Sequence, residues 1–292
     1  MQDTPANLRI GTCAWSFDDW RGVFYPEHLP SEARLAFYAR FLPAVEVDST
    51  FYGVPTAHTV AHWAEVTPDE FAFSCKLPQE ITHELRLRDA AEPLHVFLEA
   101  LAPLGKKLWC VVAQMPPSFR PWRDEGALRA FMHHLPKQVR FAFEFRNVDW
   151  HLPRIAHLFQ EHGVAWVWND LTPVDHQQEG PFEFQPDTSD LVYARLMGDL
   201  ERKYGADGRN VHHYRKLMWP RDAALENWGV RLSQALTEHR RVFVAVSNHF
   251  EGFAPHTARR LGERLGLPIV MPDLAGADGH PRTNDDRQMD LL

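Results

Sequence analysis

The chain has 292 residues, of which 45% are hydrophobic, so it can bury a sizeable core, and a single α/β barrel of about 250 residues fits within its length. A formal net charge of −8 argues against a protein that mainly coats nucleic acid or anionic lipid, so a small partner is favoured and a nucleic acid is disfavoured. The three cysteines are widely spaced, and no apolar stretch reaches the length of a membrane span. We therefore expect a reduced, cytoplasmic protein without a membrane segment.

Short runs rich in β-branched and aromatic residues recur along the chain, each ending in polar or turn residues. They predict eight strands, at residues 8–13, 44–48, 71–76, 108–114, 139–146, 164–169, 191–197 and 242–248. Apolar residues at helical spacing predict helices between them, at residues 31–42, 56–66, 92–101, 125–135, 154–162, 221–239 and 255–265. Alternation of this kind predicts a single TIM-type (β/α)8 barrel rather than a doubly wound open sheet.

We place the barrel domain at residues 8–272, with flexible ends at 1–7 and 273–292. Residues 172–190 lack a helical period, which predicts an irregular connection after the sixth strand. Residues 198–220 are rich in Arg, Lys and His, and they are long enough either to fold over the barrel mouth as a lid or to form a solvated surface loop.

Ionisable residues stand at the ends of several predicted strands. In a barrel the inward-facing side chains fill the lumen, so the alternation assigns Ala72, Ser74, Ala142 and Tyr193 to the interior. Charged and amide side chains follow above these small residues: Glu46, Asp48, Lys76, Gln114, Glu144, Arg146, Asp170, Arg195 and Asn248. Either they form salt bridges at a barrel rim, or they form a site, and we favour a site at the C-terminal mouth.

Within this set we assign catalytic roles to Glu46, Asp48, Lys76 and Glu144, and substrate-binding roles to the others. Glu144 and Arg146 are two residues apart on a strand, so a guanidinium can orient the carboxylate or shift its pKa. The aromatic residues Trp15, Tyr52 and Trp150 follow the first, second and fifth strands and are candidates to stack on a ligand, although such rings can also cap the hydrophobic layers.

Metal chemistry is less favoured than the 17 histidines suggest, because none forms a His-x-x-x-His pair on a helix. We assign no metal ligand, while an oxygen-ligated Mg²⁺ or Mn²⁺ at Glu46, Asp48 and Glu144 stays open. There is no motif for an organic cofactor. We interpret Cys13 as a buried, inert thiol rather than a nucleophile, because no base is identifiable beside it in the sequence.

Several short motifs occur together in this chain. They include Gly11-Thr12, Trp15-Ser16, residues 19–22, 24–26 and 45–52, Ile81-Thr82-His83, residues 114–119, Glu144-Phe145-Arg146 and residues 193–196. With these motifs the sequence resembles the YecE-like proteins, also called the domain of unknown function 72 family, over residues 10–265. The resemblance implies a TIM-type barrel and no defined activity. The chain departs from the usual pattern at Cys13-Ala14, at Met197 where a histidine is common, at Ser247-Asn248-His249 and at Thr257, so any chemistry that depends on those positions is expected to differ.

We weigh three functions. The first is an enzyme of hydrolase or lyase type that uses a carboxylate as general acid or base on a sugar, a phosphate ester or a nucleotide. The second is a non-catalytic protein that binds a small anion, or a nucleic acid through residues 198–220. The third is a metal-dependent enzyme. We favour the first.

Overall fold

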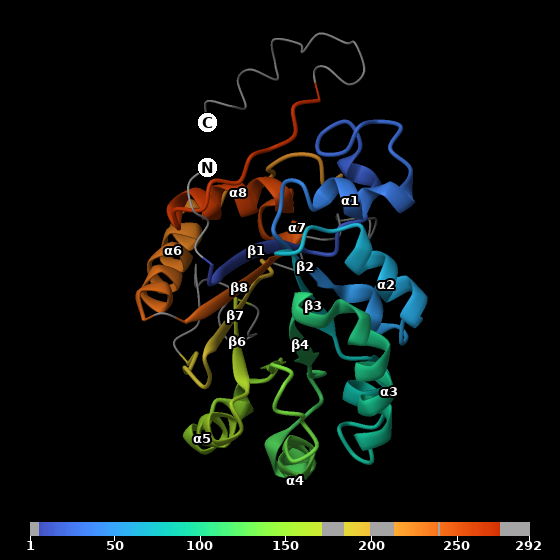
Figure 1. Ribbon diagram of the computed structural model, residues 1–292. Coiled ribbons are helices and arrows are strands. Elements are labelled where there is room, and N and C mark those ends of the chain that lie inside the picture. Colours follow the sequence, from blue (N-terminus) through green and yellow to red (C-terminus); the bar gives the residue numbers. More distant parts are fainter. Residues whose placement is uncertain (1–5, 171–183, 199–212, 239, 275–292) are drawn as a thin grey trace, which may run out of the picture.

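In the computed structural model, eight parallel strands close into a barrel with helices packed around it (Figure 1). The structure describes residues 6–170, 184–198, 213–238 and 240–274. The strands are β1 (Leu8–Cys13), β2 (Ala44–Val47), β3 (Ala72–Lys76), β4 (Leu108–Gln114), β5 (Phe141–Glu144), β6 (Ala165–Asn169), β7 (Leu191–Leu196) and β8 (Arg241–Val246). Each strand pairs with its neighbours in the sequence, and β1 pairs with β8 to close the ring. The predicted TIM-type barrel is confirmed.

The helices largely follow the predicted ranges. They are α1 (Arg34–Tyr38), α2 (Ala57–Glu65), α3 (Ala91–Leu101), α4 (Pro121–Met132), α5 (Pro153–His162), α6 (Asp222–Thr237), α7 (Asn248–Glu251) and α8 (Ala254–Arg264). Local sequence explains several ends: Thr56 caps the first turn of α2, α4 and α5 begin at proline, and Gly163 ends α5 in a left-handed conformation. The predicted helix 31–42 is instead a 3-10 turn, η2 (Ser31–Ala33), followed by the short α1.

Short helical turns occupy several of the connections, most of them directly after a strand and η5 between α3 and β4. They are η1 (Asp18–Trp20), η3 (Asp48–Phe51), the π-helical turn η4 (Glu80–Glu84), η5 (Ala102–Lys107) and η6 (Val148–Trp150). Of the predicted irregular connection, residues 184–190 are described, and they contain neither helix nor strand. Most of the basic segment 198–220 and of the tail 273–292 lies outside the described residues, so the predictions about a lid and a flexible end stay predictions.

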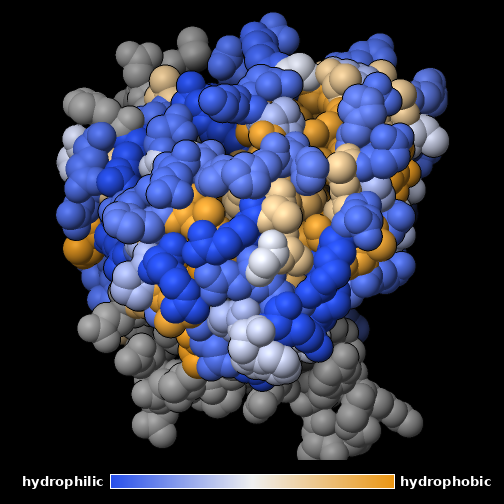
Figure 2. Space-filling model, turned by 90° about the horizontal axis from the view of Figure 1, so that it is seen from below, coloured by the Kyte–Doolittle hydropathy of each residue, from blue (hydrophilic) through white to orange (hydrophobic). Residues whose placement is uncertain are grey.

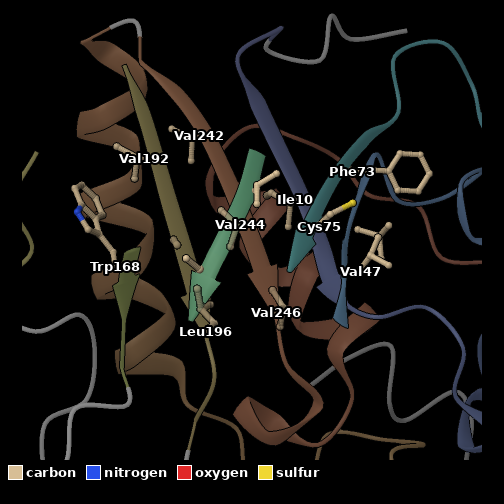
Figure 3. Close-up of a cluster of buried hydrophobic side chains, with 14 of the residues drawn as sticks. Ile10, Val47, Phe73, Cys75, Trp168, Val192, Leu196, Val242, Val244 and Val246 are labelled. Atoms are coloured by element: carbon tan, nitrogen blue, oxygen red, sulfur yellow. The ribbon is translucent and has the colours of Figure 1, made fainter. Parts of the chain in front are cut away.

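The hydrophobic core forms a shell between the strands and the helices. Figure 3 shows outward-facing side chains from neighbouring strands in this shell, among them Val192, Val244 and Val246, with Trp168 pointing towards α6. None of the helices in the described ranges is long and apolar enough to cross a bilayer. The face viewed from below Figure 1, the side on which α4 lies, is covered mainly by hydrophilic side chains with small apolar patches between them (Figure 2).

The barrel lumen has its own cluster of mostly small residues. Ala44, Ala72 and Ala142 are fully buried there, and the rings of Tyr193 and Phe243 stack with their centroids 5.0 Å apart. The predicted inward orientation of Ala72, Ala142 and Tyr193 is confirmed. Gly11 allows β1 to approach β2 closely, because a Cβ atom at this position would lie 1.9 Å from the backbone oxygen of Ala44.

Candidate active site at the barrel mouth

Arg195 is the centre of a buried ion cluster at the carboxyl end of the strands. Its Nη2 donates to Glu46 Oε1 from β2 at 2.7 Å, and its Nη1 donates to Glu144 Oε2 from β5 at 2.5 Å. Nη1 also donates to Gln114 Oε1 from β4 at 3.0 Å. Arg195 is 1% exposed, and both glutamates are fully buried. Side chains from β2, β4 and β5 therefore converge on the guanidinium that β7 supplies, as the alternating sequence pattern predicts.

The lumen residues below this cluster hold Glu46 from the other side. The Tyr193 hydroxyl donates to Glu46 Oε2 at 2.6 Å and lies 2.7 Å from Ser74 Oγ. Because a phenol carries a single proton, Tyr193 donates to one of these two oxygens at a time. Burial and the adjacent Glu46 raise the pKa of Tyr193 well above its usual value, so its hydroxyl stays a donor. The sequence placed Ser74 and Tyr193 in the lumen but did not assign them a role in holding the site.

Glu144 is fixed in its ionised form. Arg146 Nε donates to Glu144 Oε1, the oxygen that Arg195 leaves free. Burial alone would raise the pKa of Glu144, but Arg146 and Arg195 outweigh it and lower this pKa to about 2. A carboxylate with so low a pKa is a poor proton acceptor and carries no proton near neutral pH. These two ion pairs suit a residue that holds Arg146 and Arg195 in position, whereas the sequence suggested an acid or base role for Glu144.

Asp48 is a partly exposed carboxylate of the cluster. It begins η3 directly after β2, its side chain is 34% exposed, and burial together with the neighbouring Glu46 raises its pKa. Its Oδ1 lies 3.7 Å from Lys76 Nζ and 3.9 Å from Arg195 Nη2, and within the described part of the chain it accepts no hydrogen bond. A carboxyl group with a raised pKa that faces the mouth fits a general acid or base.

Lys76 completes the ionisable set at the end of β3. Burial and the nearby Arg195 lower its pKa, so its ammonium releases a proton more readily than an exposed lysine. Its Nζ lies 4.4 Å from the ring centroid of Phe51, and Thr50 Oγ1 donates to the Lys76 carbonyl at 2.7 Å. These contacts hold the lysine against the η3 loop that carries Asp48.

His83 is a further residue of the mouth to which sequence reasoning gave no role. Its ring lies 5.0 Å from that of Phe51, and its Nδ1 is 2.8 Å from Thr82 Oγ1. Burial and the cations Lys76, Arg86 and Arg146 lower its pKa, so the imidazole is neutral near pH 7. His83 is part of the Ile81-Thr82-His83 motif, so the sequence contains the pattern that marks this residue, but the motif alone assigns no role to it.

Three other predicted residues are occupied by structural contacts. Asp170 accepts hydrogen bonds from the backbone amides of Met197 and Gly198 and from Arg221, so it ties the end of β6 to the end of β7. The predicted ligand contact by Trp150 needs correction, because this side chain is fully buried and its Nε1 donates to the backbone oxygen of Phe119.

The third of these residues is Asn248, which is 4% exposed. Its Oδ1 accepts a hydrogen bond from the amide of Ala254, so it caps the turn into α8.

Two predicted aromatic residues stay at the surface of the mouth loops. Tyr52 is 78% exposed, and the partly buried Trp15 packs edge-on against Trp63. Both are open to the predicted stacking role.

A divalent metal is the alternative centre for these carboxylates. Ligand atoms of Cys13, Glu46 and Asp48 lie within 4.8 Å of one another. Burial and Glu46 raise the pKa of Cys13 well above its usual value, which keeps the thiol protonated and a weak ligand. Between Glu46 and Glu144, moreover, the Arg195 guanidinium already supplies the positive charge. The donor set fits a structural ion cluster better than the oxygen-ligated ion considered from the sequence.

The chain resembles proteins of one family over most of its length. It matches the family described as "Protein of unknown function DUF72" at residues 9–278. The UPF0759 protein YunF of Bacillus subtilis (strain 168) is 26% identical over 272 residues, which cover 89% of this chain and 95% of that protein. The UPF0759 protein YecE of Escherichia coli (strain K12) is 31% identical over 140 residues, 48% of each chain.

The crystal structure of a DUF72 family protein from Thermotoga maritima MSB8 is similar with a TM-score of 0.72 and 26% identity, covering 89% of this chain and 99% of that chain. A DUF72 family protein from Enterococcus faecalis V583, at 24% identity, shares the fold with a TM-score of 0.68 over 94% of this chain and 99% of that chain. The protein with the Arg195-centred barrel mouth therefore belongs to the DUF72 family.

Proposed function

We propose that the protein is an enzyme of hydrolase or lyase type that acts by acid/base chemistry on a small anionic or polyhydroxylated substrate, such as a sugar, a phosphate ester or a nucleotide. The observation that carries the proposal is the pair formed by Asp48 and Lys76. Their charged atoms are 3.7 Å apart, and their pKa values are shifted towards each other. Proton-transfer groups need such shifts, whereas an exposed structural ion pair does not.

Each charged residue of the mouth receives a role in this proposal. Asp48 exchanges a proton with the substrate, and Lys76 is the second proton-transfer group. Arg146, whose side chain is 16% exposed, attracts an anionic part of the substrate. Arg195, Glu46 and Glu144 are positioning residues, because they are too deeply buried to touch a ligand that enters from the mouth. The three buried, unpaired cysteines support a reducing compartment, and we place the activity in the cytoplasm.

The proposal is tested by measuring turnover of sugar phosphates, simple phosphate esters and aryl glycosides by the wild-type protein and by Asp48→Asn and Lys76→Met variants. Asp190→Asn is the matched control, because Asp190 is an exposed aspartate in a single-arginine ion pair, next to the opposite end of β7. Loss of a general acid or base lowers kcat about 10²- to 10⁴-fold, so we expect a loss in this range for Asp48→Asn and none for the control.

The pH dependence gives a second readout. A raised pKa at Asp48 and a lowered pKa at Lys76 predict a bell-shaped dependence of kcat on pH. The bell should be narrower than the ordinary pKa values of 3.8 and 10.5 would give. Wild-type kcat in the Asp48→Asn variant would refute the proposal. Tight binding of one compound without any turnover would favour the non-catalytic binder instead.

A further inference from the structure

A second cluster of charges, outside the Arg195 centre, lies where the β3–α3 and β4–α4 connections meet. Its middle is Asp124 in the first turn of α4, whose side chain is fully buried. Arg86, Arg88 and Arg123 all donate to this carboxylate, at 2.6 Å, 3.0 Å and 3.2 Å. Burial would raise the pKa of Asp124, but these arginines outweigh it and lower this pKa to about 2. Three cations thus share one permanent anion.

Neighbouring carboxylates do not compensate this excess of positive charge. Arg120 pairs with Asp149, and both Arg129 and Arg154 pair with Glu125, the residue after Asp124. Among the ion pairs of this region in the described residues, six arginines therefore meet three carboxylates. The formal charge of the whole chain is −8, so a local excess of this sign needs a specific reason.

The three arginines differ in what they still offer to a ligand. Arg86 uses its guanidinium on Asp124 and on the side chain and backbone of Ser118, and it is 19% exposed. Arg88 binds Asp124 and the Arg123 backbone through Nη2, which leaves its Nε and Nη1 without a partner in the described part of the chain. Arg123 uses Nε and Nη2, which leaves its Nη1 without a hydrogen-bond partner in the same part of the chain. Both side chains are more than 40% exposed, so these donors face solvent in fixed positions.

An exposed aromatic ring adjoins the Arg123 guanidinium. Trp122 is 79% exposed, the highest value of any large apolar side chain in the described ranges, although tryptophan is ordinarily well buried. The Arg123 guanidinium lies 5.8 Å from the centroid of its ring. An open indole next to unused guanidinium donors suits a ligand that combines a flat ring with an anionic group.

We propose that Arg88, Arg123 and Trp122 form a binding subsite for a phosphorylated compound with a planar ring, the chemical class of the nucleoside phosphates. Arginine favours phosphate because its planar fork can donate two parallel hydrogen bonds, and Asp124 holds the forks in place before the ligand arrives. Arg86 links this subsite to the mouth, because it is one of the cations that lower the pKa of His83. The subsite does not depend on the proposed reaction.

Calorimetric titration with inorganic pyrophosphate and with ADP tests the proposal. We expect the Arg88→Gln/Arg123→Gln variant to bind pyrophosphate at least tenfold more weakly than the wild type, since each lost charge-assisted hydrogen bond contributes about tenfold or more. Arg129→Gln is the matched control, because it removes the same charge from the exposed surface of α4, where Arg129 forms an ion pair with Glu125. ADP should bind more tightly than pyrophosphate to the wild type, and Trp122→Ala should abolish this difference.

Thermal melting of each variant separates lost binding from lost folding, and Arg88→Lys, which keeps the charge without the fork, should recover part of the affinity. Equal weakening by Arg129→Gln, or no pyrophosphate binding by the wild type at low ionic strength, would overturn the proposal. Equal affinity for ADP and pyrophosphate would overturn the part that concerns Trp122. These titrations measure binding and not turnover, so a failure of the acid/base proposal would leave their result unchanged.

Discussion

Replacing Arg195 with methionine is the most direct test of how the barrel mouth is stabilised. Arg195 is 1% exposed and is hydrogen-bonded to two fully buried glutamates, so its loss leaves two buried carboxylates with less compensating charge. Removing one partner of a buried ion pair typically costs about 3–5 kcal/mol. We expect a loss of this size, or somewhat more, in the free energy of unfolding at pH 7, because Glu46 then has no ion pair within the described part of the chain, while Glu144 keeps Arg146.

The sign of the pH dependence sharpens this prediction. A buried carboxylate without its cation takes up a proton more readily in the folded than in the unfolded state, so the variant should regain stability relative to the wild type as the pH falls. Urea unfolding at pH 7 and pH 5 measures both effects. The control is Arg154→Met, which breaks an exposed pair with Glu125 that contributes little to stability because solvent screens it. Equal losses for the two variants, or a deficit independent of pH, would refute the reasoning.

Further predictions concern single elements of the fold. The pKa of Glu144 is lowered from 4.5 to about 2, a difference equivalent to about 3 kcal/mol, so this contribution should be present above pH 4.5 and lost as the pH falls towards 2. The free energy of unfolding should accordingly fall less steeply with decreasing pH in Glu144→Gln than in the wild type. An unchanged slope would contradict the low pKa of Glu144. Gly11→Ala should prevent soluble expression or cost several kcal/mol on urea unfolding, because its Cβ would overlap β2, whereas Gly53→Ala, with nothing within 4 Å, should be neutral. Thr56→Ala should lower the stability by about 1 kcal/mol by thermal melting, since it removes the cap of α2, and a neutral result would refute the capping role.

Much of the architecture was predictable because strand and helix periods are local properties of the sequence. β1 and β4 have the predicted bounds, and the lumen positions follow from simple alternation. The convergence of Glu46, Lys76, Glu144 and Arg195 also follows, since the carboxyl ends of parallel strands meet at one edge. The sequence could not assign roles within the set, because those depend on which residues pair across the barrel.

The misjudged residues show the same limit. The burial of Trp150 between Phe119 and Phe145 depends on loops far apart in the sequence. In the sequence Asp170 is indistinguishable from a rim carboxylate, because the backbone amides of Met197 and Gly198 that bind it follow another strand. His83, Arg86 and Arg88 lie in a loop with a π-helical turn and left-handed backbone at Arg86, Leu87 and Asp89, which no local period indicates.

The position of Arg195 also bears on the order of events during synthesis. Glu46 and Glu144 leave the ribosome with β2 and β5, but the guanidinium that neutralises both arrives only with β7, 51 residues after Glu144. Until then Glu144 has Arg146, but a partial ring would have to bury Glu46 without its ion-pair partner, which the low dielectric of a protein interior strongly disfavours. Closing the ring around Glu46 is thus favoured only once β7, about two-thirds of the way along the chain, has been made.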